Sequence, residues 1–346
     1  MINENEKIIL DFIRKSKGTT SKEIYEATQK IASYATIKRL LSKLVANNLV
    51  IKEGNGKSTK YLISEFYEIL FPINMVSYFE NEIDNRTIKE YFNFNLIEQT
   101  LKEISLFTKE EIAHLEFLQN KFKENISALS EIAYKKELER LAIDLSWKSS
   151  QIEGNTYSLL ETEILLKEKI TATGKTKEEA IMLINHKEAI DFIVDNPDYL
   201  IPLTISKIED IHRLLTKDLG ISKNLRKRKI GISGTNYKPL ETDYQISEAL
   251  IAMCELANKK ENVFEKALLV LLLISYIQPF EDGNKRTARI VSNAILLNYQ
   301  HCPISYRTID SIDYKKAMLL FYEQNNVFNF KDIFIKQFEF AVKTYF

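Results

Sequence analysis

Apolar side chains recur at helical spacing through the first part of the chain. Between residues 6 and 14 they fall three and four positions apart, and they do so again between residues 34 and 46. In the second stretch Leu, Ile and Val share one face, whereas Lys and Arg lie off it. A short helix is expected between the two, with Thr20 or Ser21 as its N-cap. The pattern therefore predicts three helices in the first 46 residues.

A β-hairpin is predicted directly after these helices. Two short apolar runs, residues 49–51 and 61–63, flank a turn-rich stretch that contains Gly and Asn. Three helices followed by a hairpin resemble a winged helix-turn-helix domain, in which the third helix enters the major groove of DNA. The resemblance implies such a domain over residues 1–64. Its candidate DNA-contacting residues are Thr36, Lys38, Arg39 and Lys43.

Charge is distributed unevenly along the chain. The protein has 48 basic and 48 acidic residues, but residues 1–63 hold 12 Lys and Arg against 6 Asp and Glu, a net charge of +6. Basic charge is thus concentrated where contact with DNA phosphates is expected. Winged helices also act as protein-docking or dimerising modules, so a homodimer stays open as an alternative.

Beyond residue 64 the pattern is almost entirely helical. Helical periodicity runs nearly unbroken through residues 88–148 and returns in three segments after residue 289. The composition of 45% apolar residues with only 9 Gly and 6 Pro suits a compact, mainly α protein. We expect a helical connector over residues 65–148, which includes the start of one long helix, and a helical core over residues 149–346.

Several classes of protein are disfavoured by what the sequence lacks. No apolar run reaches about 18 residues, and the first residues do not have the order of a signal peptide. The two cysteines suit buried thiols in a reducing compartment, and the four histidines form no metal-ligand pattern. We therefore expect a cytoplasmic protein without membrane contact.

The most informative segment follows an apolar stretch, residues 267–277, that marks a buried helix. Pro279 ends this helix, and the tripeptide 282–284 is a turn in which Gly283 can take a positive φ and align backbone N–H groups. Those N–H groups and the positive end of the next helix dipole would converge on one point, as they do in phosphate-binding sites. Guanidinium and ammonium groups would add to this site. The basic residues in the first turns of the new helix are Lys285, Arg286 and Arg289.

Residues 278–289 resemble the signature of the Fic family, His-x-Phe-x-Asp/Glu-Gly-Asn-Gly-Arg-x-x-Arg. Gln278 stands where the family has its catalytic His, and Lys285 where it has its second Gly. Members of this family mostly transfer AMP from ATP to a protein hydroxyl, so the resemblance implies an all-helical core that binds ATP and Mg²⁺. The alternative is a helix pair capped by a charged turn with solvated arginines. The residues that fit the signature in type and spacing are Phe280, Asp282, Gly283, Asn284, Arg286 and Arg289.

The resemblance also implies a role for each of these residues. Gly283, Asn284 and Lys285 would form a nest of backbone N–H groups, Arg286 would hold a phosphate, and Arg289 would contact the γ-phosphate. Asp282 is the metal candidate, because a carboxylate beside phosphates suits Mg²⁺. Some family members with Lys at this position are thought to bind ATP in a reversed sense, so the direction of the nucleotide stays open.

Gln278 limits the activity that the resemblance implies. In the family, the His takes a proton from the target hydroxyl, a role that requires a pKa near neutrality. A primary amide cannot take that proton, and loss of a general base costs about 10² to 10⁴ in rate, roughly 3 to 5 kcal/mol. We expect nucleotide binding without efficient transfer. Three explanations stay open: a natural non-catalytic or altered member, a base supplied from elsewhere, or a mutation made to trap an inactive form.

Residues 149–155 resemble the inhibitory motif Ser/Thr-x-x-x-Glu-Gly/Asn of many Fic proteins, with Ser149 in its first position. In those proteins the Glu, here Glu153, pairs with the second Arg of the signature and blocks placement of the γ-phosphate. The alternative is an ordinary helix end, with Gly154 in the left-handed conformation and the carboxylate solvated.

Residues 230–239 alternate apolar and small side chains around turn formers, as in a short β-hairpin. Fic proteins carry such a flap over the active site, where a target strand pairs with it. The resemblance makes Gly234, Thr235 and Tyr237 candidate contacts of an unknown target protein; the alternative is an ordinary surface hairpin. The basic stretch before it, residues 224–229, is expected to be a solvated loop.

Two functions remain open from the sequence. The first is a protein adenylyltransferase that is auto-inhibited and impaired by Gln278. The second is a nucleotide-sensing transcriptional regulator that binds DNA and has no transferase activity.

Overall fold

The computed structural model describes residues 3–16, 18–28 and 31–346, and the chain divides into two compact units, residues 1–72 and 73–346. Boundaries at residues 64 and 148 stay predictions. One more helix follows the hairpin within the first unit, and the helices of residues 109–152 pack on other helices of the second unit.

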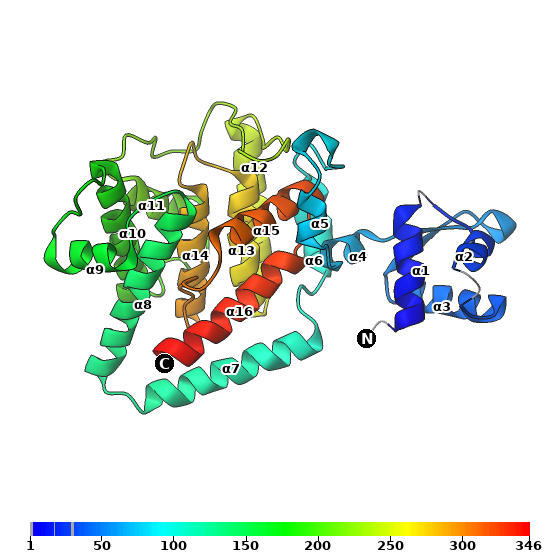
Figure 1. Ribbon diagram of the computed structural model, residues 1–346, viewed down its shortest axis with the longest axis horizontal. Coiled ribbons are helices and arrows are strands. Elements are labelled where there is room, and N and C mark those ends of the chain that lie inside the picture. Colours follow the sequence, from blue (N-terminus) through cyan, green and yellow to red (C-terminus); the bar gives the residue numbers. More distant parts are fainter. Residues whose placement is uncertain (1–2, 17, 29–30) are drawn as a thin grey trace. The chain divides into compact units, whose positions relative to one another are not determined.

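The first unit has the helix and strand order of a winged helix-turn-helix domain (Figure 1). Its helices are α1 (Glu4–Lys15), α2 (Ser21–Ala27), α3 (Tyr34–Ala46) and α4 (Glu65–Leu70). The antiparallel wing pairs β1 (Val50–Glu53) with β2 (Lys60–Ile63) through a 3₁₀ turn, η1 (Gly56–Ser58). Thr20 caps α2 in a capping box, and Ile9, Ile24 and Leu41 form part of the buried core.

The described backbone of the second unit is mainly helical. Short elements open it: α5 (Met75–Phe79), the 3₁₀ turn η2 (Ile83–Asn85), the π-helical turn η3 (Leu96–Thr100) and α6 (Leu101–Glu103). Long helices follow: α7 (Lys109–Ser127), α8 (Glu131–Ile152), α9 (Leu159–Glu168), α10 (Lys177–Asp195) and α11 (Ile205–Thr216). The chain ends with α12 (Asp243–Lys259), α13 (Val263–Ile277), α14 (Asn284–Asn298), α15 (Ser311–Gln324) and α16 (Phe328–Tyr345).

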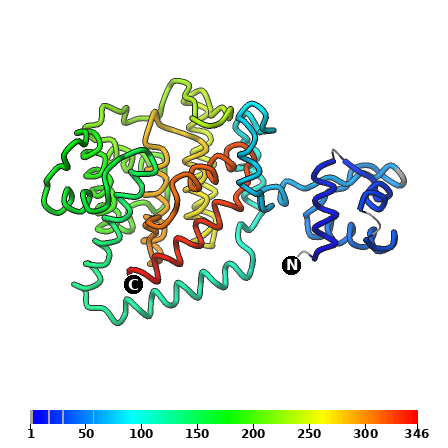
Figure 2. Tube along the Cα trace, in the orientation of Figure 1, coloured from blue at the N-terminus to red at the C-terminus, as the bar shows by residue number. Residues whose placement is uncertain are grey.

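Helices α13 and α14 form the centre of this unit (Figure 1). Helix α13 is buried from Phe264 to Ile277, as its apolar sequence predicts. Helices α8, α10 and α11 pack on α14, whereas α12 and α15 pack on α13, and α16 lies beside α7 (Figure 2). The loop between α13 and α14 is therefore held by two buried helices.

Residues 230–239 do not form the paired strands expected of a hairpin. They run without regular structure through a turn at Ser233 and Gly234. Lys238 instead forms an isolated parallel bridge with Tyr91, and its N–H donates to the carbonyl of Glu90 (2.7 Å). A pattern of local alternation could not reveal this pairing, because its two sides lie far apart in the sequence. Among the residues described, no helix is both long and apolar enough to span a membrane.

Candidate functional site

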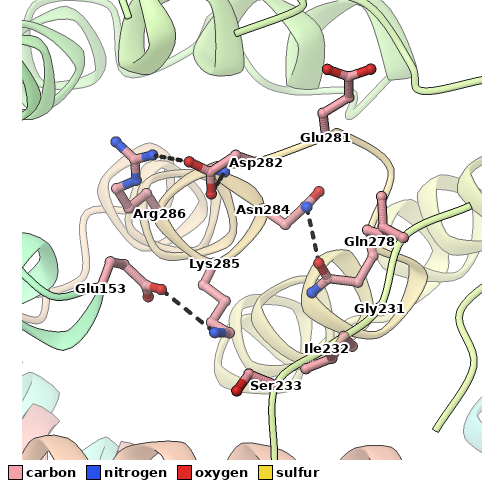
Figure 3. Close-up of a pocket in the computed structure, with 12 residues that line it drawn as sticks. Glu153, Gly231, Ile232, Ser233, Gln278, Glu281, Asp282, Asn284, Lys285 and Arg286 are labelled. Atoms are coloured by element: carbon pink, nitrogen blue, oxygen red, sulfur yellow. Dashed lines mark hydrogen bonds and ion pairs between the residues drawn. The ribbon is translucent and has the colours of Figure 1, made fainter. Parts of the chain in front are cut away.

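The loop begins at Gln278, which ends α13 in the left-handed conformation (φ 51°, ψ 59°). Its side-chain amide is buried, and both its nitrogen and its oxygen form hydrogen bonds. Nε2 donates to the carbonyl of Ser275 (2.6 Å) and lies 3.5 Å from the hydroxyl of Tyr322, and Oε1 accepts from Nδ2 of Asn284 (3.0 Å; Figure 3). These are contacts between neutral groups, so residue 278 brings no titratable group to the site.

Asn284 closes the loop upon itself. Its Oδ1 accepts from the N–H of Phe280 (2.8 Å), and its Nδ2 donates to the carbonyl of the same residue (2.9 Å). Gly283 adopts a φ of 80°, and a Cβ there would meet Thr216 and His212 at 3.4 to 3.5 Å. The Asn284 side chain is thus used to hold the turn. If this residue contacted an anion, it would do so through its backbone N–H. The first N–H groups of α14 have no partner within the helix, as at any helix start.

Arg286 is one of the residues that line a pocket of about 170 Å³. Its guanidinium is buried, and Nη2 lies 3.3 Å from Oδ2 of Asp282. Nε and Nη1 are also buried but have no hydrogen-bond partner among the described residues. Each unsatisfied buried donor costs about 1 to 3 kcal/mol. An anion in the pocket would remove this cost.

Arg289 is fully buried and holds the segment predicted to be inhibitory. Its Nε donates to Oγ of Ser149 (2.8 Å), and its Nη2 donates to the Ser149 carbonyl (3.0 Å) and to Oε1 of Glu153 (2.8 Å). The second oxygen of Glu153 lies 3.5 Å from Nζ of Lys285 (Figure 3). Burial raises the pKa of Glu153, but Arg289 and Lys285 outweigh it, so the pKa is lowered and the carboxylate stays charged.

Sequence reasoning missed His186 on α10, which completes this network. Oγ of Ser149 accepts from Arg289 and is also hydrogen-bonded to Nε2 of His186 (2.6 Å). Burial, together with Arg289 and Arg286, holds the pKa of His186 well below its usual value, so the ring is neutral and can accept. The one signal in the sequence was a polar residue on the buried face of an amphipathic helix.

A second pocket of about 350 Å³ adjoins the charged one and shares with it Glu153, Lys285, Ile232 and Ser233. Most of its remaining lining is apolar or aromatic. The site therefore has two compartments: the first pocket is charged and the second is largely apolar. Residues 232 and 233 line both of them. The further lining residues are Ile152, Gly234, Tyr314, Lys315, Met318, Leu319 and Tyr322.

Comparison with protein families agrees with this geometry. A model described as Fic/DOC family matches residues 202–296, which contain the flap segment and the segment from Gln278 to Arg289. The chain contains a Fic/DOC domain. A second model, described as penicillinase repressor, matches residues 2–65 and coincides with the winged-helix unit.

Curated relatives match part of the chain. The protein adenylyltransferase Fic of Nematostella vectensis is 29% identical over 195 residues, 54% of this chain and 43% of that protein. Protein adenylyltransferase fic-1 of Caenorhabditis briggsae is 26% identical over 161 residues, 44% of this chain and 31% of that protein. The chain thus spans less than half the length of these relatives.

Solved structures confirm the fold. Fic-1 (residues 134–508) from C. elegans aligns with a TM-score of 0.60 and 20% identity, covering 68% of this chain and 72% of that one. A Fic domain containing signaling protein from Bacteroides thetaiotaomicron aligns with a TM-score of 0.56 and 20% identity, covering 66% of this chain and 94% of that one.

The three flap residues singled out in this Fic domain differ in their surroundings. The carbonyl of Gly234 accepts from Nη1 of Arg86 (3.2 Å), and Oγ1 of Thr235 accepts from the N–H of Tyr237 (3.1 Å). Tyr237 is buried, stacks on Tyr276 with ring centroids 4.9 Å apart, and donates its hydroxyl to the Tyr276 carbonyl (3.1 Å). Tyr237 therefore anchors the flap to α13 and is not placed to contact a target.

The four residues proposed to face DNA lie on α3 but are not equally free. Lys38 and Arg39 are exposed, and the ammonium of Lys38 lies 4.9 Å from the centroid of the Tyr34 ring. Thr36 is partly buried, and its N–H donates to the capping hydroxyl of Ser33 (3.2 Å). Lys43 forms an ion pair of 2.7 Å with buried Glu6, which ties α3 to α1 and neutralises part of the basic face.

Asp282 is the one metal candidate from the sequence, and its side chain is largely exposed beside the pocket. One oxygen accepts from the N–H of Gly283 (2.6 Å). In the part of the chain that the structure describes, no group of three or more His, Cys, Asp or Glu residues could hold a metal ion. Of the carboxylates that line this pocket, Glu153 pairs with Arg289 and Glu281 with Arg228, which leaves Asp282 as the most exposed oxygen ligand. A single carboxylate suits a cation that keeps waters and takes its other ligands from a bound molecule.

Proposed function

We propose that this protein binds a Mg-nucleotide in its Fic domain, that Glu153 inhibits the site, and that Gln278 impairs AMP transfer to a protein hydroxyl. The observation that carries the proposal is Arg286, a pocket-lining residue whose buried guanidinium has two nitrogens, Nε and Nη1, without a partner among the described residues. Such donors are rare in folded proteins unless they serve a ligand.

The two compartments fit the two chemical parts of a nucleotide. Phosphates would bind at Arg286 and at the backbone N–H groups that open α14, where the helix dipole favours negative charge. The apolar compartment would take the base against Tyr322, Met318 and Ile152. Asp282 would hold Mg²⁺, which would neutralise charge on the phosphates.

Inhibition rests on the ion pair between Glu153 and Arg289. The carboxylate occupies one edge of the guanidinium that a γ-phosphate would otherwise use, and a second negative group at the same place would be repelled. Lys285 adds a second cation to the carboxylate at 3.5 Å. The segment is therefore both a helix end, with Glu153 as C-cap of α8, and a clamp on the arginine.

Docking of a target is proposed at the open part of the flap. The described residues make no hydrogen bond to the backbone of residues 230–233, and this stretch lines the charged pocket. An extended segment of a target protein could pair with it by β-augmentation, whereas Lys238 is already paired with residues 90 and 91. This arrangement would bring a target hydroxyl close to residue 278.

A second candidate function is a nucleotide-sensing DNA-binding regulator without transferase activity. It is supported by the match to the penicillinase repressor model and by the net charge of +6 on residues 1–63. The two functions separate in two assays. Incubation with labelled ATP and a cell lysate detects covalent transfer, and titration of the chain with duplex DNA, with and without ATP, detects nucleotide-dependent DNA binding.

Calorimetry with ATP and Mg²⁺ tests the nucleotide site directly. We expect the native chain to bind, and Glu153→Gly to bind about tenfold more tightly, a difference of about 1.4 kcal/mol. Glu168→Gly is a matched control, because this carboxylate is exposed at the end of α9. If neither the native chain nor the Glu153 variant binds ATP, the site assignment is wrong. Equal affinities would instead reject the inhibitory role.

A further inference from the structure

Arg226 is a buried arginine in the stretch before the flap that the sequence suggested was solvated. It is 1% exposed and bonds to four backbone carbonyls. Nε donates to the carbonyl of Gln278 (2.6 Å), Nη1 to that of Arg228 (2.8 Å) and Nη2 to that of Leu240 (2.6 Å). Its own N–H donates to the carbonyl of Pro279 (3.0 Å).

The acceptors share one property: each is a neutral carbonyl. No ion pair with a carboxylate is formed by Arg226 within the described chain, although taking a charge out of water is costly when no opposite charge compensates. A smaller neutral residue would fill this position at lower cost unless the shape of the guanidinium were needed. Its planar fork is the one side chain that can donate in three fixed directions at once.

The three carbonyls that accept from the Arg226 side chain belong to the two ends of the flap and to residue 278. Arg228 precedes the flap, Leu240 follows it, and Gln278 is the position at which the Fic signature has its base. We infer that Arg226 is a positioning residue that sets the distance between the flap and residue 278. The inference rests on the proposed function, since it concerns a target hydroxyl that the flap delivers to that position.

Such spacing matters because group transfer depends on near-contact geometry. A displacement of about 1 Å between reacting groups can cost about 10²-fold in rate. Arg226 is not among the residues that line the charged pocket, whereas Arg286 and the start of α14 are, so the proposed phosphate contacts do not involve it. Loss of the fork should therefore disturb the delivery of a target and leave nucleotide affinity nearly unchanged.

Hydrogen exchange of the full-length chain tests this inference. Arg226→Lys keeps the charge but cannot donate in three fixed directions. We expect exchange to accelerate at least about tenfold at the hydrogen-bonded N–H groups of Tyr237 and Lys238 and in the peptide covering residues 276–282, with ATP affinity changed less than about twofold. Arg228→Lys is the matched control, because its side chain is 73% exposed and pairs with Glu281 at the surface.

The outcomes separate a positioning role from a structural one. Exchange at the flap and at residue 278 that is unchanged, or that rises equally through all helices of the second unit, overturns the inference. If Arg226→Lys does not fold, the same exchange measurement is made on Arg226→Gln, with the same expected and contrary results. A transfer-competent background, Gln278→His with Glu153→Gly, adds a kinetic readout, in which KM for the protein target should rise more than KM for ATP. Absence of ATP binding in every variant would contradict the proposed function and leave the exchange result interpretable.

Discussion

The segment from Gln278 to Arg289, a loop followed by the first turns of α14, has a charged end with unpaired or replaceable partners and a neutral end whose side chains are hydrogen-bonded. At the charged end, Arg286 keeps unpaired donors, and Arg289 is held by a carboxylate that a phosphate could replace. At the neutral end, the amides of Gln278 and Asn284 are hydrogen-bonded to each other and to the backbone. Under the proposed function, nucleotide binding and proton transfer would depend on different residues of this segment. One substitution could then remove proton transfer without harming nucleotide binding.

Restoring a base at the neutral end should give the largest effect. Gln278→His, combined with Glu153→Gly to open the charged end, should raise AMP transfer by about 10² to 10⁴ over the Glu153→Gly chain. The left-handed backbone at this position should accept His, which is enriched there among non-Gly residues. Transfer is measured with labelled ATP on the chain itself and on lysate proteins.

The matched control replaces one amide by another, Gln278→Asn with Glu153→Gly, and should stay inactive. Strong transfer by the unmodified chain would show that another base or another chemistry operates. If the His variant stays inactive although it binds ATP, Lys285→Gly is added to test the second departure from the signature.

Removing the open donors at the charged end should give the next largest effect. Arg286→Ala should weaken ATP binding by about 1.5 to 3 kcal/mol, as expected for a hydrogen bond to a charged group. Calorimetry measures this change, and Arg286→Met checks that it does not arise from lost packing. Arg213→Ala is the control, because this arginine pairs with Asp210 at the surface. An equal loss in both alanine variants would mean that overall charge, and not this contact, governs affinity.

The sequence predicts the parts of this comparison that are local. The turn at Gly283, the helix start after it and the capped helices of the winged unit follow from residues within one or two turns of each other. His186 and Arg226 could not be found in this way, because His186 meets Ser149 and Arg226 meets Gln278 across long stretches of chain. The expected hairpin failed for the same reason, since Lys238 pairs with Tyr91. Alternation in a sequence shows that a strand can form but not what it pairs with.

Acid should weaken the clamp on the charged end. Burial raises the pKa of Glu153 and the nearby cations lower it more, so its pKa in the folded protein lies below the ordinary value of 4.5. The stabilisation from its charge is therefore fully present above pH 4.5 and is lost as the pH falls through the lowered pKa. We expect the ratio of ATP affinities between Glu153→Gln and the native chain to stay constant from pH 8 to 5. The ratio should fall toward one at lower pH.

Taking a ratio removes the protonation of ATP itself, which is common to both chains. Glu168→Gln gives the baseline, because this exposed carboxylate makes no contact with the site. A ratio that changes between pH 8 and 5 would mean that another group controls the clamp.

Substitution of Lys285 should have the smallest effect on ATP affinity, because its contact with Glu153 is long and partly exposed to solvent. Its ammonium is 3.5 Å from Glu153 with the side chain one quarter exposed, and pairs of this kind contribute about 0.2 to 1 kcal/mol. Lys285→Met removes one ammonium group with two expected effects on ATP affinity. Loss of its contact with Glu153 weakens the clamp and raises the affinity, whereas loss of its attraction for the phosphates lowers it. In the native background the two effects oppose each other. In the Glu153→Gly background only the second remains, and ATP affinity should fall by up to about fivefold.

Calorimetry of the double-mutant cycle gives the coupling between the two residues. Lys336→Met is the control, since Lys336 is exposed on α16 and pairs with Asp332 outside both compartments. The same loss of affinity in both backgrounds would show that Lys285 serves the phosphates alone, and that Arg289 holds Glu153 without its help.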